Sequence, residues 1–102
     1  MLRIGVQDEG ESTIFMIEGK LTAPSTIELE KCWQEAKGAR PLRHFVVKLA
    51  AVTFIDSESR ELLARMRRQG VNLVPTGCLM KAIVEQIEAQ VTRERLSSHA
   101  PN

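Results

Sequence analysis

The chain has 102 residues, enough for one domain with a single hydrophobic core. Its 43% apolar and 26% charged residues are typical of a soluble globular protein, and its formal net charge of +1 gives no global field to attract nucleic acid or an anionic membrane. No apolar run reaches the roughly 18 residues that span a bilayer, and residues 1–7 lack the apolar core of a secretion signal. We therefore expect a cytoplasmic protein that does not insert into a membrane.

Two strands are expected at the start of the chain. Residues 2–7 alternate apolar and polar side chains, as in a strand with one buried face. A polar turn at residues 8–12 follows, with Gly10 available for a positive φ. Residues 14–17 are apolar without alternation, which predicts a central strand covered on both faces and paired antiparallel with the first. Residues 19–24 are expected to break this strand.

The first helix has two candidate starting points. Ser25 and Glu28 have the spacing of a capping box, whereas Thr22 is a competing N-cap because Pro24 would then lie in the first turn. The start of the helix therefore stays open by a few residues. Gly38 is expected to end it. Its apolar face is predicted to pack into the core and carries Leu29, Cys32, Trp33 and Ala36.

Two further strand–helix pairs follow. Residues 43–49 predict the third strand, and a second helix starts near Arg60 and is stopped by Gly70. Residues 71–74 predict a short fourth strand. The third helix is predicted by apolar residues that recur at helical spacing: Met80, Ile83, Val84, Ile87 and Val91.

The resulting element order is β-β-α-β-α-β-α. Two successive β-α-β units impose right-handed crossovers, so the fold class is α/β with a mixed, mostly parallel four-stranded sheet covered by three helices. The first strand is expected to form an antiparallel edge. Residues 1–91 make up the predicted domain, and the polar residues 92–102 are expected to form a C-terminal tail.

Residues 52–59 join the third strand to the second helix and carry the strongest functional signal. The strand ends in a short loop, and Asp56, Ser57 and Ser59 offer side-chain oxygens where the helix begins. Such oxygens cap free backbone N–H groups, and the positive end of the helix dipole favours negative charge there. A phosphate on one of the hydroxyls would be electrostatically favoured at the same place.

Residues 54–59 resemble the signature loop of STAS domains (sulfate transporter and anti-sigma factor antagonist), which often reads Phe-Met/Ile-Asp-Ser-Ser/Thr-Gly. Residues 18–22 resemble the family's Gly-x-Leu-Asp turn after its second strand, and residues 70–74 resemble its fourth strand. The last helix is similar to the family's third. The likeness extends from Leu2 to Ile87 and implies a STAS-like fold.

The chain departs from the family pattern within these motifs. The aspartate of the Gly-x-Leu-Asp turn is Thr22 here. The second hydroxyl of the signature loop, which is the usual phosphorylation site of the family, is Glu58, and the glycine after it is Ser59. The family's fifth strand is not visible, because residues 90–102 are polar.

The resemblance implies a non-catalytic regulatory module of bacterial signalling that binds other proteins. In anti-sigma factor antagonists the partner resembles a serine kinase that sequesters a sigma factor. The alternatives are an accessory STAS subunit of an ABC lipid transporter, which binds the ABC ATPase, and a domain that senses a small anion or a nucleotide. The partner-binding residues that the resemblance implies are Leu21, Thr22, Asp56, Ser57, Glu58, Ser59 and Arg60.

Three interpretations of residues 56–59 stay open. In the first, Asp56 and Ser57 only cap the helix. In the second, Glu58 is a fixed substitute for phosphoserine, although a carboxylate carries about −1 and a phosphate about −1.5 to −2. In the third, Ser57 or Ser59 is phosphorylated, against the repulsion of the neighbouring Glu58.

Other chemistry has little support in the sequence. Cys32 and Cys78 fit neither a metal-site spacing nor a disulfide framework, and no cofactor motif is present. A nucleophile and a base could come from Cys78 and His44, but no spacing supports this pair, so an enzyme is not expected. The turn at residues 75–78 is more typical of an ordinary helix entry than of an anion site.

The second helix has a basic side, which we expect to be a solvated face or a patch that docks an acidic protein. Nucleic-acid binding is not expected, because the aromatic side chains that could stack on bases are predicted to be buried or half-buried. The exposed first strand leaves room for a homodimer. The basic side consists of Arg60, Arg65, Arg67 and Arg68.

Overall fold

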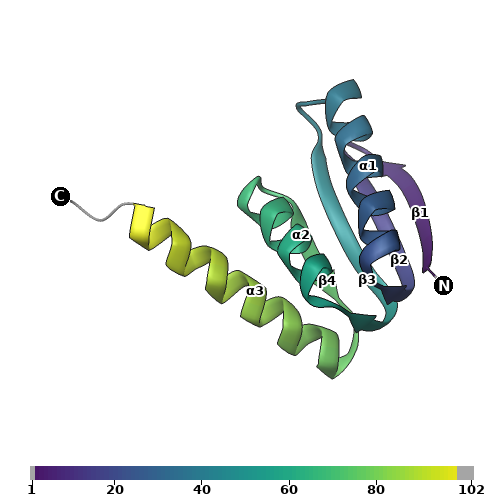
Figure 1. Cartoon of the computed structure of the whole chain (residues 1–102). Helices are drawn as coiled ribbons and strands as arrows, with labels where there is room; N and C mark the ends of the chain where they lie inside the picture. Colours follow the sequence, from purple (N-terminus) through teal and green to yellow (C-terminus); the bar gives the residue numbers. More distant parts are fainter. Residues whose placement is uncertain (1, 99–102) are drawn as a thin grey trace.

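The computed structural model of the chain describes residues 2–98. Its elements follow the order β-β-α-β-α-β-α that the sequence predicts (Figure 1). They are β1 (Leu2–Glu9), β2 (Ser12–Leu21), α1 (Ala23–Ala39), β3 (His44–Ile55), α2 (Ser57–Arg68), β4 (Asn72–Pro75) and α3 (Gly77–Ser98).

The strands form one four-stranded sheet in the order β1-β2-β3-β4, so each strand lies beside its neighbour in the chain. β1 pairs antiparallel with β2 across a tight turn in which Gly10 has φ 57°, and the β2–β3 and β3–β4 pairs are parallel. The mixed, mostly parallel sheet with an antiparallel edge is therefore confirmed. Within residues 2–98 there is no fifth strand.

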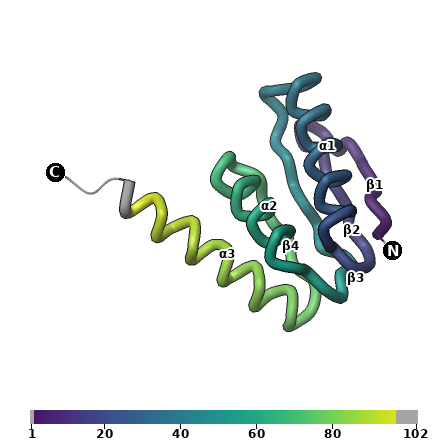
Figure 2. Tube along the Cα trace, viewed as in Figure 1, coloured from purple at the N-terminus to yellow at the C-terminus, as the bar shows by residue number. Residues whose placement is uncertain are grey.

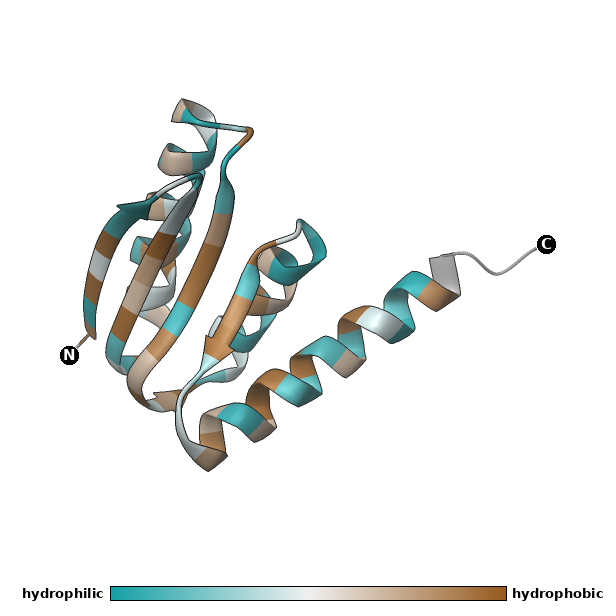
Figure 3. Cartoon of the chain, turned by 180° about the vertical axis from the view of Figure 1, so that it is seen from behind, coloured by the Kyte–Doolittle hydropathy of each residue, from teal (hydrophilic) through white to brown (hydrophobic). Residues whose placement is uncertain are grey.

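The α1 and α2 helices lie on one side of the sheet, α3 lies beside α2 and extends beyond the β4 edge, and the other face of the sheet is open. Figure 3 shows this open face with β1 to β4 in front and α1 and α2 behind them. Burial alternates along β2 accordingly: Phe15 and Ile17 have no exposed surface, whereas Ile14 and Met16 are half-buried. The prediction that this strand is covered on both faces was wrong, because the apolar residues of the open face resemble core residues in sequence.

The core lies between the sheet and the α1 and α2 helices. The Phe15 and Phe45 rings stack there with centroids 6.2 Å apart, and Trp33 of α1 is buried as predicted. Cys32 is half-buried and packs at the margin of the core. The side chains of Leu62, Leu63 and Met66 bring α2 into the same core.

The loop between β2 and α1 is shorter than the sequence predicts. Gly19 does not break β2 but has φ 108° next to two register shifts against β3, so the strand bends and continues to Leu21. Thr22 is the N-cap residue of α1, although its side chain makes no capping hydrogen bond. The alternative start at Ser25 and Glu28 was wrong, because Pro24 already stands in the first helical turn.

α3 is longer than expected and packs on α2. Figure 2 shows it on the far side of α2 from α1, running from the end of β4 past the body of the sheet. Residues 92–98 are helical where a polar tail was predicted, and residues 99–102 lie outside the described part of the chain. The helix is anchored by a buried stripe of Met80, Val84, Ile87 and Val91.

Candidate functional site

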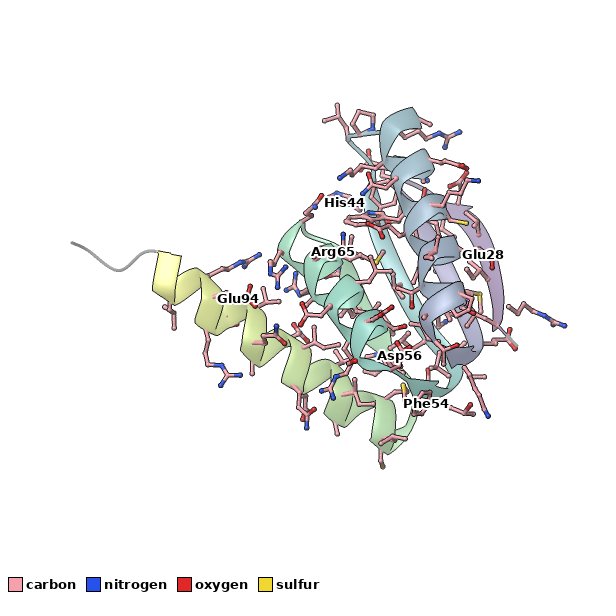
Figure 4. All side chains as sticks on the ribbon, in the orientation of Figure 1. Glu28, His44, Phe54, Asp56, Arg65 and Glu94 are labelled. Carbon is pink, nitrogen blue, oxygen red and sulfur yellow. The ribbon has the colours of Figure 1, made fainter. Side chains whose placement is uncertain are left out.

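The candidate site lies where β2 and β3 end side by side. Leu21 and Ile55, the last residues of the two parallel strands, are register partners, and each strand leads within two residues into a helix. In α/β sheets, sites are commonly built at this carboxyl edge. Figure 4 shows Asp56 at this end of the sheet and His44 at the opposite end.

The carboxylate of Asp56 lies at the start of α2 and close to the start of α1. Its Oδ1 accepts a hydrogen bond of 2.9 Å from the backbone N–H of Ser59, which makes Asp56 the N-cap of α2 as predicted. Hydrogen bonding by Ser59, from its side chain and then its backbone, lowers the pKa of Asp56 below its ordinary 3.8, and the N–H of Ala23 adds to this. Asp56 is therefore ionised and fixed between two helix dipoles.

A buried pair of hydroxyl groups joins the two helices beneath Asp56. The hydroxyl oxygens of Thr26 on α1 and Ser59 on α2 are in hydrogen-bond contact, and Ser59 has no exposed surface. The Ser59 hydroxyl also lies 3.0 Å from the carbonyl of Leu21, and that of Thr26 lies 3.0 Å from the carbonyl of Thr22. Since Asp56 N–H donates to the Leu21 carbonyl at 3.1 Å, the ends of both strands are tied to the starts of both helices.

The sequence analysis missed Thr26, although a signal was present. Thr26 is spaced three and seven residues from Leu29 and Trp33, which places all three on the buried face of α1. A threonine in such an apolar stripe must satisfy its hydroxyl inside the protein. The spacing therefore marks Thr26 as a candidate partner for another buried polar group.

The residues named from the family resemblance differ in exposure. Ser57 and Glu58 are exposed in the first turn of α2, and Asp56 and Thr22 are half-buried beside them. Leu21 and Ser59 have no exposed surface, so Leu21 contributes through its backbone and the Ser59 hydroxyl faces the interior. The accessible part of the site consists of residues 22–24 and 56–58, which we call the two-helix surface.

The basic side of α2 is not a free patch. Arg60 donates to the amide oxygen of Gln86, and Arg65 pairs with Glu30 of α1 at 2.8 Å. Arg67 and Arg68 pair with carboxylates of α3, and the Arg68 hydrogen bond lowers the pKa of Glu94. The structure therefore agrees with a solvated face whose arginines pair with neighbouring carboxylates, and the docking of an acidic partner stays a prediction.

The other chemical candidates do not assemble into a site. Cys78 follows β4 at the carboxyl edge of the sheet, whereas His44 begins β3 at the opposite edge, so the two are not brought together. Among residues 2–98 no group of three or more His, Cys, Asp or Glu side chains is placed to hold a metal ion. No helix of this part of the chain is both long and apolar enough to cross a membrane.

Comparison with solved structures supports the architecture. An anti-sigma factor antagonist from Mycobacterium paratuberculosis superposes with a TM-score of 0.76 at 18% sequence identity, and the match covers 90% of this chain and 82% of that one. The chain has a STAS-like fold. This agrees with the resemblance carried by residues 54–59. No protein-family model matches the sequence, and no curated protein matches it.

The STAS-like fold of this chain also matches part of a larger protein. Two crystal structures of Mglu give TM-scores of 0.57 and 0.56 at 22% and 21% identity. These matches cover 72% and 71% of this chain but only 19% and 22% of the Mglu chains. They show that the arrangement of strands and helices recurs within a longer polypeptide.

Proposed function

We propose that this chain is a non-catalytic regulatory module that binds another protein through the two-helix surface. The proposal is supported by its STAS-like fold, by the likeness to an anti-sigma factor antagonist, and by the position of residues 56–58 in the signature loop. Fold alone does not define function. The chemistry of this surface therefore carries the argument.

The single observation that carries the proposal is the fixed position of Asp56. Its ionised carboxylate accepts the 2.9 Å hydrogen bond that caps α2, and the backbone N–H of Ala23 at the start of α1 also favours its charged form, which gives the loop a defined conformation. Ser57 and Glu58 follow it directly and point to solvent from the first turn of α2. A rigid, exposed and negatively charged loop is a surface that a partner can recognise by shape and charge.

Glu58 supplies a permanent negative charge on this surface. It stands where the STAS signature has its phosphorylated hydroxyl, and its place in the first turn of α2 suits a negative charge. We propose that Glu58 holds the module in one binding state, which a phosphoserine would create only transiently. Its single charge and two oxygens reproduce a phosphate only in part.

Ser57 remains the accessible phosphorylation candidate. It is exposed at the first position of α2, whereas the Ser59 hydroxyl is enclosed. We propose that phosphate at Ser57 would add to the charge of Glu58 and change the affinity for the partner. Phosphopeptide mapping of protein from its own cells tests this, and an unmodified Ser57 under all growth conditions would reject it.

The class of partner that we propose is a serine-kinase-type anti-sigma factor. A tagged wild-type chain should capture this partner from the lysate of its own organism, and titration calorimetry with the purified partner should then give a dissociation constant. Capture of an ABC ATPase would support the transporter alternative. A thermal shift with small anions or nucleotides, without any protein partner, would support the sensor alternative.

Substitutions separate the surface from the rest of α2. Glu58→Ser and Glu58→Gln remove the charge from the two-helix surface, and we expect at least a tenfold change in affinity if a partner contacts it, equivalent to about 1.4 kcal/mol. Glu61→Gln is the matched control, because Glu61 is also exposed on α2 but lies one turn further along. Equal affinities of the Glu58 and Glu61 variants would overturn the proposal.

A further inference from the structure

The open face of the sheet carries a continuous apolar surface. Phe54 is 50% exposed and Val74 is 38% exposed, and no element of residues 2–98 lies over them (Figure 3). Strand register places Ile14 beside Val46 on the same face. Single exposed apolar side chains are common, but a contiguous group marks an interaction surface. The apolar side chains of this surface, which we call the open-face surface, are Ile14, Met16, Val46, Ala51, Phe54 and Val74.

The charges on the open-face surface are unbalanced. Lys48 lies in the middle of the apolar side chains, and Lys20 lies beside Phe54 near the end of β3. Arg3 of β1 lies opposite Glu18 of β2. Since paired residues share a face of the sheet, three cations and one carboxylate are set among the apolar side chains.

The three cations are not neutralised within the chain. Arg3, Lys20 and Lys48 make no ion pair and no side-chain hydrogen bond within residues 2–98, whereas the arginines of α2 all do. Glu9 lies at the opposite end of the sheet, beside the turn into β2, and does not offset them. Positive charge among apolar side chains is stabilised when carboxylates meet it. The open-face surface therefore fits a partner that is both apolar and acidic.

The sheet itself indicates the kind of element that would cover this surface. Parallel strands occur almost only in sheets with helices on both faces, whereas α1 and α2 cover one face of β2, β3 and β4. Ile14, Met16 and Val46 are half-buried, so the side chains of a helix that pack between them reach more of their surface than a planar membrane does. A second copy of this face would place cations against cations.

We infer that the open-face surface binds an acidic amphipathic helix of another protein. The apolar side of that helix packs on β2, β3 and β4, and its carboxylates meet Lys48 and Lys20. Lys48 pairs with Met16, and Lys20 lies four residues further along β2, which is about 13 Å along the strand. Two turns of a helix span about 11 Å, so carboxylates spaced by about two turns fall within reach of both lysines. This surface is separate from the two-helix surface, and the inference does not rest on the proposed function.

Two synthetic peptides test the chemistry of the partner. One is an amphipathic helix of about 18 residues with leucines on its apolar side and glutamates about two turns apart at its border, and the other has lysines in place of the glutamates. Fluorescence anisotropy should give a dissociation constant below about 100 μM for the glutamate peptide and at least about tenfold weaker binding of the lysine peptide. Backbone NMR shifts caused by the glutamate peptide should gather on β2, β3 and β4.

Charge reversal locates the binding site. Lys48→Glu should weaken the binding of the glutamate peptide by about tenfold or more, and Lys48→Glu/Lys20→Glu should bind the lysine peptide more tightly than the glutamate peptide. Lys31→Glu is the matched control, because Lys31 is exposed on α1 at the covered side of the sheet, and its reversal should change the affinity by less than about threefold. Folding is checked in every variant by the emission of Trp33, the one tryptophan of the chain.

The inference is overturned if the glutamate peptide does not bind at concentrations up to about 1 mM, or if the two peptides bind equally. Equal effects of Lys48→Glu and Lys31→Glu would also overturn it. Vesicles of equal parts phosphatidylcholine and phosphatidylglycerol are the probe for a membrane, and vesicle binding that requires Lys48 in the absence of peptide binding would assign the surface to lipid instead. A wild-type dimer in sedimentation velocity that Lys48→Glu dissociates would assign the surface to a second copy instead.

Discussion

The hydroxyl oxygens of Thr26 on α1 and Ser59 on α2 are in direct contact inside the protein. Around them lie the carbonyls of Leu21 and Thr22, which end β2 and begin the turn into α1. The pair therefore positions one part of the two-helix surface relative to the other. Ser59 stands where the STAS signature has a glycine, so this contact is made by a residue in which the chain departs from the family pattern.

The first prediction concerns this contact. Ser59→Ala and Thr26→Val should each lower the free energy of unfolding by about 1 kcal/mol, because each removes a buried hydrogen bond without creating a new buried donor. The double variant should be less destabilised than the sum of the two, since both substitutions remove the same contact. Urea denaturation followed by Trp33 fluorescence measures all three.

Ser57→Ala is the control for these hydroxyl deletions, because Ser57 is exposed on the same helix. Its effect should stay within about 0.5 kcal/mol. If the changes in the free energy of unfolding caused by Ser59→Ala and Thr26→Val add up exactly in the double variant, this would contradict a direct contact between the two hydroxyl groups.

The second prediction concerns the charge of Asp56. Its pKa in the folded chain is lower than the ordinary 3.8, so its ionised form stabilises the fold above that value, and the stabilisation is lost as the pH falls through the folded pKa. Asp56→Asn keeps the capping oxygen but cannot ionise. Its melting temperature should lie below that of the wild type near neutral pH, and the difference should shrink below about pH 4.

Glu30 and Glu94 also have lowered pKa values, because each is paired with an arginine. Both glutamates are present in the wild type and in Asp56→Asn, so their effect on the melting temperature cancels when the two proteins are compared. A difference in melting temperature that stays constant through the acid range would contradict the assignment to Asp56.

The third prediction tests whether α3 is docked as described. Ile87 is 1% exposed, and Ile87→Ala should lower the free energy of unfolding by about 2–5 kcal/mol because it leaves a cavity between α2 and α3. Leu96 lies on the same helix but is 67% exposed, so Leu96→Ala should change stability by less than about 0.5 kcal/mol. Similar effects of the two substitutions would show that α3 does not pack along α2.

The fourth prediction compares two glycines in different backbone conformations. Gly70 has φ 93° where the chain leaves α2, so Gly70→Ala should destabilise the fold by about 1–2 kcal/mol. Gly38 lies inside α1 with nothing within 4 Å of the position of an added Cβ, and Gly38→Ala should stabilise the fold by about 0.4–1 kcal/mol. Thermal unfolding of both variants checks the opposite signs.

Patterns of residues close together in the sequence were sufficient to predict the order of the strands and helices and the N-cap of α2. Asp56 was identified as a cap because the rule depends on residues close together in the chain, whose geometry a helix start determines. Gly70 was identified as the end of α2 for the same reason.

Features that depend on contacts between distant segments were not predictable in this way. The Thr26–Ser59 contact joins residues 33 positions apart, and the pairing of α2 arginines with α3 depends on where α3 docks. The open sheet face on which Phe54 lies was not predicted either, since an apolar residue at a strand end looks the same whether its face is covered or open.

The strand order β1-β2-β3-β4 has a consequence for how the fold can be acquired. Since each strand pairs with the one made just before it, a nascent chain can extend the sheet as each segment leaves the ribosome. No later strand is inserted between two strands that have already paired. α3 is synthesised after the whole sheet, so its docking on α2 would be the last step, and an incomplete chain would expose the apolar flank of α2 to chaperones.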